Sequence, residues 1–196
     1  MEGLQASRGS VGKEAPKNTF RSMTIKEVAN LKNLVNAYEL IKSNPGNMTP
    51  GVEPETLDGI NKAFLLKVQA ELLAGKFNFP AARRVEIPKP GKPGETRPLT
   101  IASPRVVVVQ KAMLLIMEPH FESMFMNTSH GFRPKRGTQT AMLQVEAQFQ
   151  SAHYIVEADF SKAFYSISHS KLMELIARHV KDEKLLRLIR SGLKAG

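Results

Sequence analysis

The sequence has no cysteine, no long hydrophobic run and few acidic residues to balance its basic ones. The absence of cysteine excludes disulfide bonds and thiolate metal sites, and it fits a reducing compartment. The longest apolar runs, such as residues 113–117, are too short to cross a bilayer, so no membrane partner is expected. The histidines show no metal-ligand spacing, so no histidine metal site is expected either.

The charge of the chain is strongly positive and unevenly distributed. Its 196 residues include 28 Lys and Arg against 18 Asp and Glu, which gives a net charge of +10. Residues 76–136 alone hold eleven basic residues and four acidic ones. Such a segment predicts a polyanionic partner, and nucleic acid is the first candidate. The alternative, from composition alone, is an ordinary solvated surface that happens to be basic.

Hydrophobic spacing and turn residues predict a mixed α/β chain of short strands with helical cover. Residues 1–22 are polar and indicate a tail without regular structure. A capping box at Thr24 opens an amphipathic helix to residue 41, and a second helix over 57–72 has Gly75 as its stop. The remaining elements are expected at 83–87 and 96–101 (strands), 105–118 (helix, closed by Pro119), 138–149 (helix), 154–159 (buried strand), 170–180 and 183–193 (helices).

The two strands at 83–101 form a hairpin with a Pro/Gly-rich turn that concentrates positive charge. Arg84, Lys89, Lys92 and Arg97 all fall within it. Four cations in one hairpin repel each other unless a polyanion neutralises them, and Arg can clamp phosphate through two hydrogen bonds. Phosphate contact is therefore favoured over an exposed hairpin whose charges only keep it in solution.

Two further positions carry candidate chemistry. The Gly131-Phe132-Arg133-Pro134 sequence suits stacking and charge contact with an RNA strand. The alternative is a turn with Phe132 in the core, and both hold if Phe132 is buried while Arg133, Lys135 and Arg136 lie outside. Asp159 ends the predicted buried strand, where a carboxylate is poorly placed unless it serves a cation. The alternative for Asp159 is to cap the backbone N–H groups of residues 161–163.

Four segments, in this order, resemble group II intron-encoded reverse transcriptases and maturases of the organellar type. They are residues 38–46 with 56–59, 82–89 with 96–99, 129–137, and 158–164. The resemblance covers residues 35–196. It implies the fingers of a reverse transcriptase and the first part of its palm. The expected divisions are a polar tail (1–22), an N-terminal helical extension (23–80), a fingers-like part (81–150) and a partial palm (151–196).

The resemblance also implies roles for individual residues. Lys89 and Arg97 would meet the triphosphate of an incoming nucleotide, Phe164 would lie against the sugar, and Asp159 would bind both of two Mg²⁺ ions. The full set expected to contact RNA or nucleotide phosphates is Arg83, Arg84, Lys89, Lys92, Arg97, Arg105, Arg133, Lys135 and Arg136.

The paired aspartates of the later palm motif are not found in these 196 residues. Because two divalent cations need several carboxylates, the chain is expected to be inactive alone and to need no cofactor. It would use Mg²⁺ only if a partner completed the palm. Three settings remain open, all with RNA as partner. They are a piece of an intron-splicing maturase, an rRNA-bound structural subunit of a mitochondrial ribosome or similar ribonucleoprotein, and a split polymerase completed by a palm–thumb chain. The expected location is mitochondrial, free or within a ribonucleoprotein.

Overall fold

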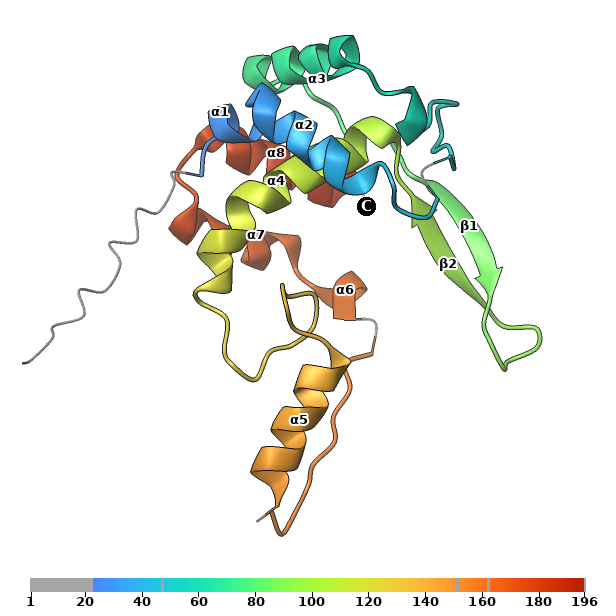
Figure 1. Ribbon diagram of the computed structural model, residues 1–196, viewed down its shortest axis with the longest axis vertical. Helices are drawn as coiled ribbons and strands as arrows, with labels where there is room; N and C mark the ends of the chain where they lie inside the picture. Colours follow the sequence, from blue (N-terminus) through green and yellow to red (C-terminus); the bar gives the residue numbers. More distant parts are fainter. Residues whose placement is uncertain (1–22, 47, 151, 162, 196) are drawn as a thin grey trace, which may run out of the picture.

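The computed structural model describes residues 23–46, 48–150, 152–161 and 163–195, and the predicted tail at 1–22 lies outside this described part. The elements in chain order are α1 (Ile25–Val28), α2 (Leu31–Ile41), the 3₁₀ turn η1 (Leu57–Gly59), α3 (Lys62–Ala74), β1 (Arg83–Pro88), β2 (Thr96–Ile101), α4 (Pro104–Glu122), α5 (Thr138–Phe149), α6 (Ala163–Ser166), α7 (His169–His179) and α8 (Glu183–Ala195). The predicted mixed α/β class is confirmed. Figure 1 shows the hairpin and α5 extending away from the other helices.

Helix α4 forms the centre of the core. Val108, Val109 and Ala112 on α4 are completely buried, and α2 packs along them through Leu34 and Ala37. Side chains of α1, α3, α7 and α8 join the same apolar cluster. The valine run at 106–109 is thus explained by packing. The predicted divisions at residues 80 and 150 stay a prediction.

Local capping decides where the N-terminal helices begin and end. The capping box at Thr24 is present, but the single helix predicted as far as residue 41 is wrong. The Asn30 side chain accepts a hydrogen bond from the Lys32 N–H (2.9 Å) and starts α2 as a separate helix. Asn61 caps α3 in the same way, after the turn η1. Gly75 ends α3 with a φ of 68°, the left-handed conformation expected of a glycine stop.

Pro119 does not close α4, which continues to Glu122. Proline removes one intrahelical hydrogen bond, and its ring crowds the preceding turn. Only the last turn of a 19-residue helix follows it, and that helix is held by a buried face ending at Ile116. The prediction that Pro119 ends the helix was therefore wrong by one turn.

The strand predicted at 154–159 is absent. Residues 152–160 have no regular structure and are all exposed. A strand needs a neighbour to satisfy its backbone groups, and within the described ranges β1 and β2 pair only with each other. Figure 1 shows this segment running back beside α5. The hydrophobic residues of the 154–159 segment predicted that it is buried, but in the structure these residues are exposed.

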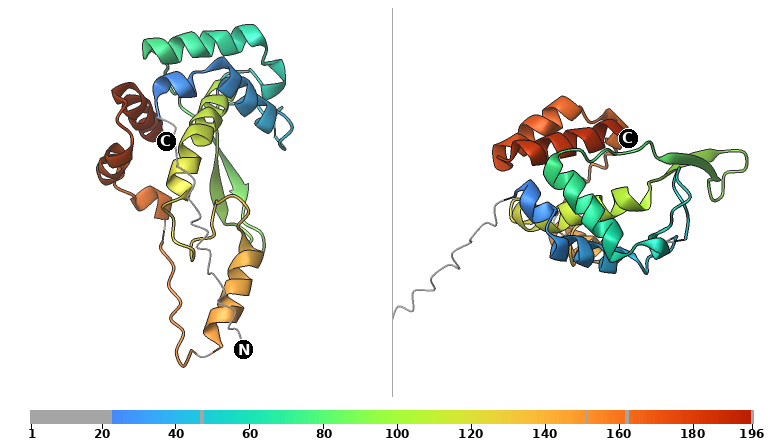
Figure 2. Two further views of the ribbon diagram at one scale, coloured as in Figure 1. Left: turned by 60° about the vertical axis from the view of Figure 1, so that its left-hand side comes forward. Right: turned by 90° about the horizontal axis from the view of Figure 1, so that it is seen from above.

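Helices α7 and α8 are confirmed close to their predicted bounds, and they dock against the N-terminal helices. Asp182, just before α8, accepts a hydrogen bond from the Ile25 N–H (3.1 Å), and Lys184 Nζ donates to the Leu73 carbonyl (2.9 Å). Figure 2 shows both helices side by side along one edge of the molecule. In the described part of the chain no helix is both long and apolar enough to cross a membrane.

Candidate nucleic-acid interface

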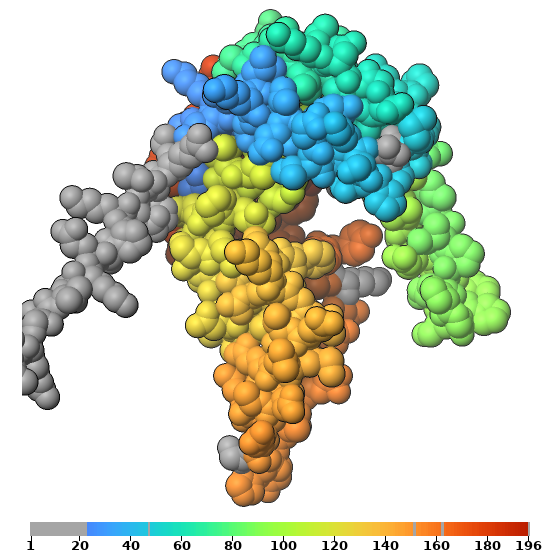
Figure 3. Space-filling model, in the orientation of Figure 1, coloured from blue at the N-terminus to red at the C-terminus, as the bar shows by residue number. Residues whose placement is uncertain are grey.

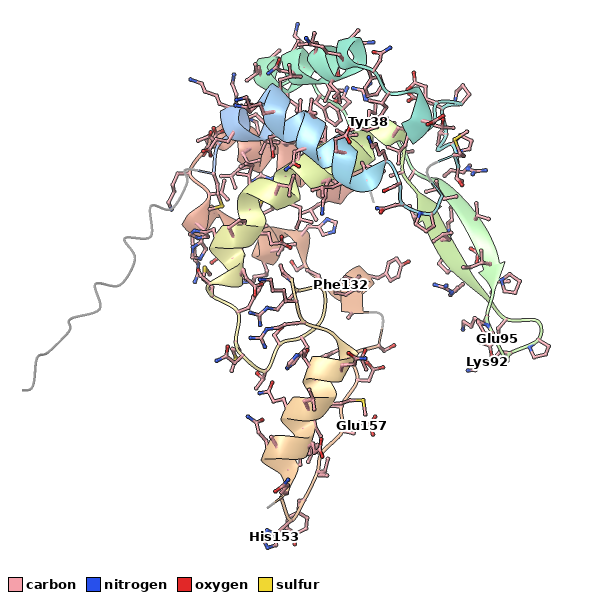
Figure 4. All side chains as sticks on the ribbon, viewed as in Figure 1. Tyr38, Lys92, Glu95, Phe132, His153 and Glu157 are labelled. Atoms are coloured by element: carbon pink, nitrogen blue, oxygen red, sulfur yellow. The ribbon has the colours of Figure 1, made fainter. Side chains whose placement is uncertain are left out.

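The β1–β2 hairpin carries the predicted cations on a projecting arm. Its strands pair in register from Arg83 opposite Ile101 to Pro88 opposite Thr96. Gly91 and Gly94 take φ values of 72° and 83° in the connecting turn, a conformation that glycine adopts at little cost. Lys92 lies at the tip, as Figure 4 shows. The predicted hairpin and its basic turn are confirmed.

The hairpin cations divide between the two faces of the sheet. Side chains alternate along a strand, and residues directly opposite share a face. The register therefore puts Arg83 and Arg97 on the face that also carries Val85 and Ile87, while Arg84 lies on the other. A polyanion that contacts all of them must wrap around the arm or reach its edge and tip.

Two hairpin cations have acidic neighbours within the arm. Arg84 Nε lies 3.2 Å from Glu86 Oε1, and Lys89 Nζ lies 2.7 Å from Glu95 Oε2. These pairs are exposed, so they stabilise the hairpin little and can exchange for a phosphate. Within the described ranges, Arg83, Lys92 and Arg97 have no carboxylate within salt-bridge distance. The arm therefore presents uncompensated positive charge.

The 129–137 loop exposes its aromatic side chain and buries one of its arginines. Phe132 is 95% exposed with a φ of 58°, so the alternative that placed Phe132 in the core is wrong. The Arg133 side chain, expected outside, is only 6% exposed. Its guanidinium donates to both oxygens of Glu122 (2.7–3.1 Å) and to the carbonyls of Met126 and Ser129 (2.7 Å each). Arg133 therefore organises the loop, because nearly all its donors are used within the protein.

The Arg133–Glu122 contact changes the acidity of the carboxyl group. Hydrogen bonds from Arg133 are the main cause that holds the pKa of Glu122 below its ordinary value of 4.5. The charge of the guanidinium acts in the same direction, while partial burial opposes it. The ion pair is thus fully formed at neutral pH.

The other two cations of the loop differ in whether their side chains are bound within the protein. Arg136 donates to the Asn127 carbonyl (2.6 Å) and to its side-chain oxygen (3.3 Å), which ties the loop to the end of α4. Lys135 is exposed and has a φ of 59°. Of the three cations predicted here, Lys135 is the one whose side chain extends into solvent without a partner in the described part of the chain.

The exposed Phe132 meets the exposed Phe164 of α6. Their ring centroids are 6.2 Å apart with the planes at 75°, an edge-to-face pair. Phe164 remains 75% exposed. The space-filling view shows a hollow between the hairpin and the body formed by residues 123–149, with α6 beside it (Figure 3). The structure thus brings together two aromatic positions that are 32 residues apart in the sequence.

Asp159 lies in the exposed segment before α6. Because Asp159 is exposed, burial does not require its carboxylate to bind a cation. No three His, Cys, Asp or Glu side chains come close enough to hold a metal ion in the part of the chain that the structure describes. A metal-binding role for Asp159 stays a prediction.

Arg105 has a structural environment that the sequence did not predict. It forms an ion pair with Glu71 of α3, and its guanidinium lies 4.8 Å from the centre of the Phe77 ring. Both charged side chains are about one quarter exposed. Arg105 therefore joins α4 to α3, and phosphate binding by this residue remains untested.

Sequence reasoning also missed Glu122 and Asn127, the partners of Arg133 and Arg136. One signal was available for Glu122, which is among only four acids in a segment with eleven basic residues. A hydrophobic pattern contains no information about which arginine such an acid pairs with.

A family model described as reverse transcriptase (RNA-dependent DNA polymerase) matches residues 87–195. The COX1/OXI3 intron 1 protein of Saccharomyces cerevisiae is 41% identical over 85% of this chain and 20% of its own length. The group II intron-encoded protein LtrA of Lactococcus lactis subsp. cremoris is 35% identical over 82% of this chain and 26% of its own length. The chain belongs to the reverse transcriptase family, and it is similar to group II intron-encoded members of that family.

A plant relative is named as a mitochondrial intron maturase. The nuclear intron maturase 1, mitochondrial, of Arabidopsis thaliana is 36% identical over 44% of this chain and 12% of its own length. The chain spans about a fifth of the length of the yeast intron relative. The predicted resemblance is thus confirmed, and the match covers the hairpin turn, the 129–137 loop and α6.

Proposed function

We propose that this chain binds structured RNA through the β1–β2 hairpin and the 129–137 loop, and that its RNA is a group II intron. The observation that supports the proposal is the projecting hairpin, which contains five basic residues and only two acidic ones. RNA of complex shape is recognised mainly through its ribose-phosphate backbone and its unstacked bases. The hairpin offers cations for the first and Phe132 an exposed ring for the second.

The relatives support intron RNA as the target. Several are named as intron proteins or intron maturases, and one of them is named as mitochondrial. A mitochondrial location and a role in intron splicing follow as part of the proposal. Ribosomal RNA and partner proteins of a ribonucleoprotein remain the alternative targets.

The 196-residue chain by itself should bind RNA without polymerising. Asp159 is exposed, and no group of three metal-ligand residues surrounds it in the described ranges. Two-metal phosphoryl transfer needs several carboxylates on both ions. If a separate palm–thumb chain completed the active site, Asp159 would be the residue of this chain that binds Mg²⁺.

The test is a titration of the chain with a folded group II intron domain at several salt concentrations. Replacing Arg84, Lys89 and Arg97 with Ala should weaken binding and flatten its salt dependence, because each lost phosphate contact removes about 0.7–0.9 from the slope. A variant with Lys26, Lys62 and Lys67 changed to Ala loses the same charge from exposed helical positions and should bind nearly as well. Equal affinities for the two variants would place the RNA elsewhere.

Two further measurements separate the alternatives. RNA that co-purifies with the chain should be intron RNA, whereas ribosomal RNA would favour the structural subunit. Primer extension with Mg²⁺ and a template–primer duplex should give no product, and product from this chain alone would contradict the non-catalytic proposal.

A further inference from the structure

Helix α8 exposes a second group of cations outside the hairpin and the 129–137 loop. Its basic residues recur at intervals of three, three and four, which places them along one side of the helix. Leu185, Leu188 and Ile189 on the opposite side are buried in the core. The exposed side is here named the α8 basic face, and it consists of Lys184, Arg187, Arg190 and Lys194.

The α8 basic face keeps a net positive charge, because α8 contains one acid, Glu183, beside the four cations. In the described ranges, none of its four side chains forms an ion pair with a carboxylate. The carboxylate of Asp182 is occupied as a helix cap, since it accepts from the N–H groups of Lys184 (2.8 Å) and Leu185 (2.9 Å). Lys184 and Arg187 each donate one hydrogen bond to a backbone carbonyl, which leaves their charge uncompensated.

Helix stability explains these cations only in part, since Glu183 lies one turn before Arg187 and pairs favourably with that one position. Like charges three or four residues apart destabilise a helix by repulsion. Lys194 in the last turn does complement the helix dipole, but Lys184 lies in the first turn, where a cation opposes it. A bound polyanion would relieve the repulsion among all four.

The C-terminal end of α8 lies beside the base of the hairpin. Gly192 lies so close to Phe79 that an added Cβ would sit 3.3 Å from its ring, so the absence of a side chain lets the helix approach. Ala195 lines the same small cavity as Ala82, which precedes the exposed Arg83. Figure 2, seen from above, shows the C-terminal end of α8 beside the start of the hairpin.

We infer that the α8 basic face is a second ribose-phosphate binding surface, contacted by RNA that passes the base of the hairpin. The inference rests on the proposed RNA-binding function and adds a contact surface to it. The four cations span Lys184 to Lys194, about 15 Å of helix at 1.5 Å per residue, enough to meet several phosphates. Because the C-terminal end of α8 lies beside the base of the hairpin, the RNA proposed to bind the hairpin is favoured over an acidic protein as the partner.

The experiment compares two triple variants of the whole chain in the RNA titration. Arg187→Gln/Arg190→Gln/Lys194→Gln removes three charges from the α8 basic face, and Lys26→Gln/Lys62→Gln/Lys67→Gln removes three from exposed positions on α1 and α3. The first should lose about tenfold in affinity at moderate salt, with a salt slope smaller by about 2, and the second should bind nearly like the wild type.

A second measurement avoids any folding defect in the variants. Acetylation of lysines in the wild-type chain should slow at Lys194 when RNA is bound and stay unchanged at Lys26. Unchanged affinity of the α8 variant, or unprotected Lys194, would overturn the inference while leaving the hairpin proposal intact. A wild-type chain that binds no RNA would instead overturn the proposed function itself.

Discussion

The Arg133 guanidinium donates hydrogen bonds from two of its nitrogens to the Glu122 carboxylate. The same group also donates to backbone carbonyls of the loop between Glu122 and Arg133. Nε lies 3.1 Å from both carboxylate oxygens, and Nη2 lies 2.7 Å from one. This contact turns the loop so that Phe132 points outward, where it meets Phe164. An arginine predicted to bind RNA thus shapes the surface on which an aromatic residue is presented.

Replacing Arg133 with Lys should loosen the 123–137 loop. An ammonium group cannot reproduce the planar fork that reaches Glu122, Met126 and Ser129 together. Limited proteolysis at neutral pH should cut the variant faster within this loop than the wild type. Lys135→Gln, at an exposed neighbour, should be cut at the wild-type rate, and equal rates for all three proteins would contradict the structural role of Arg133.

The ion pair between Arg133 and Glu122, which holds this loop in place, should be lost at acid pH. Because the pKa of Glu122 is lowered in the folded chain, its ion pair contributes stability above the ordinary value of 4.5. That contribution is lost as the pH falls from about 4.5 through the lowered pKa. The NMR signal of the Arg133 Nε–H should therefore hold its position from pH 7 to 5 and shift below that range. In Glu122→Gln the shift should be absent, and a wild-type transition above pH 5 would be inconsistent with a lowered pKa.

Phe132 should contribute to RNA binding and little to folding. Its ring is almost fully exposed, so Phe132→Ala removes no core contact. Stacking of one base on an aromatic side chain is worth about 1–3 kcal/mol, so the variant should lose roughly 5- to 150-fold in affinity for single-stranded or bulged RNA. Phe132→Tyr should retain most of the binding. Unaltered affinity of the Ala variant, measured by fluorescence anisotropy, would leave Phe132 without this role.

Arg105 should stabilise the fold. Its ion pair with Glu71 is mostly shielded from water, and Arg105→Ala also removes the contact with the Phe77 ring. We expect the free energy of unfolding to fall by about 1–3 kcal/mol in urea titrations, the cost of losing a charged hydrogen bond and exposing its partner. Lys111→Ala, on the same helix, should cost less. If Arg105→Ala unfolds like the wild type but loses RNA affinity, the predicted phosphate role would replace the structural one.

Much of the fold could be predicted because it depends on local signals. The capping box at Thr24, the glycine stop at Gly75 and the alternating strands around the 88–94 turn each specify their own element. The break at Asn30 and the helical turn after Pro119 were missed. Whether a capping residue or a proline ends a helix also depends on how neighbouring helices pack against that part of the chain.

The candidate site was less predictable because it depends on contacts between distant residues. The sequence identifies Phe132 and Arg133 but not which of them is buried, which depends on Glu122 eleven residues earlier. The 154–159 segment has the composition of a buried strand, yet a strand also requires partners that composition does not contain. The α8 cations were visible in the sequence, but only the packing of α8 shows that they share one exposed side.

Cross-linking of bound RNA to the wild-type chain, with the linked peptides identified by mass spectrometry, tests the central claim most directly. The account predicts cross-links at the 83–101 hairpin and at Phe132 in the 129–137 loop. Cross-links confined to other surfaces, with both of these elements free of RNA, would contradict it.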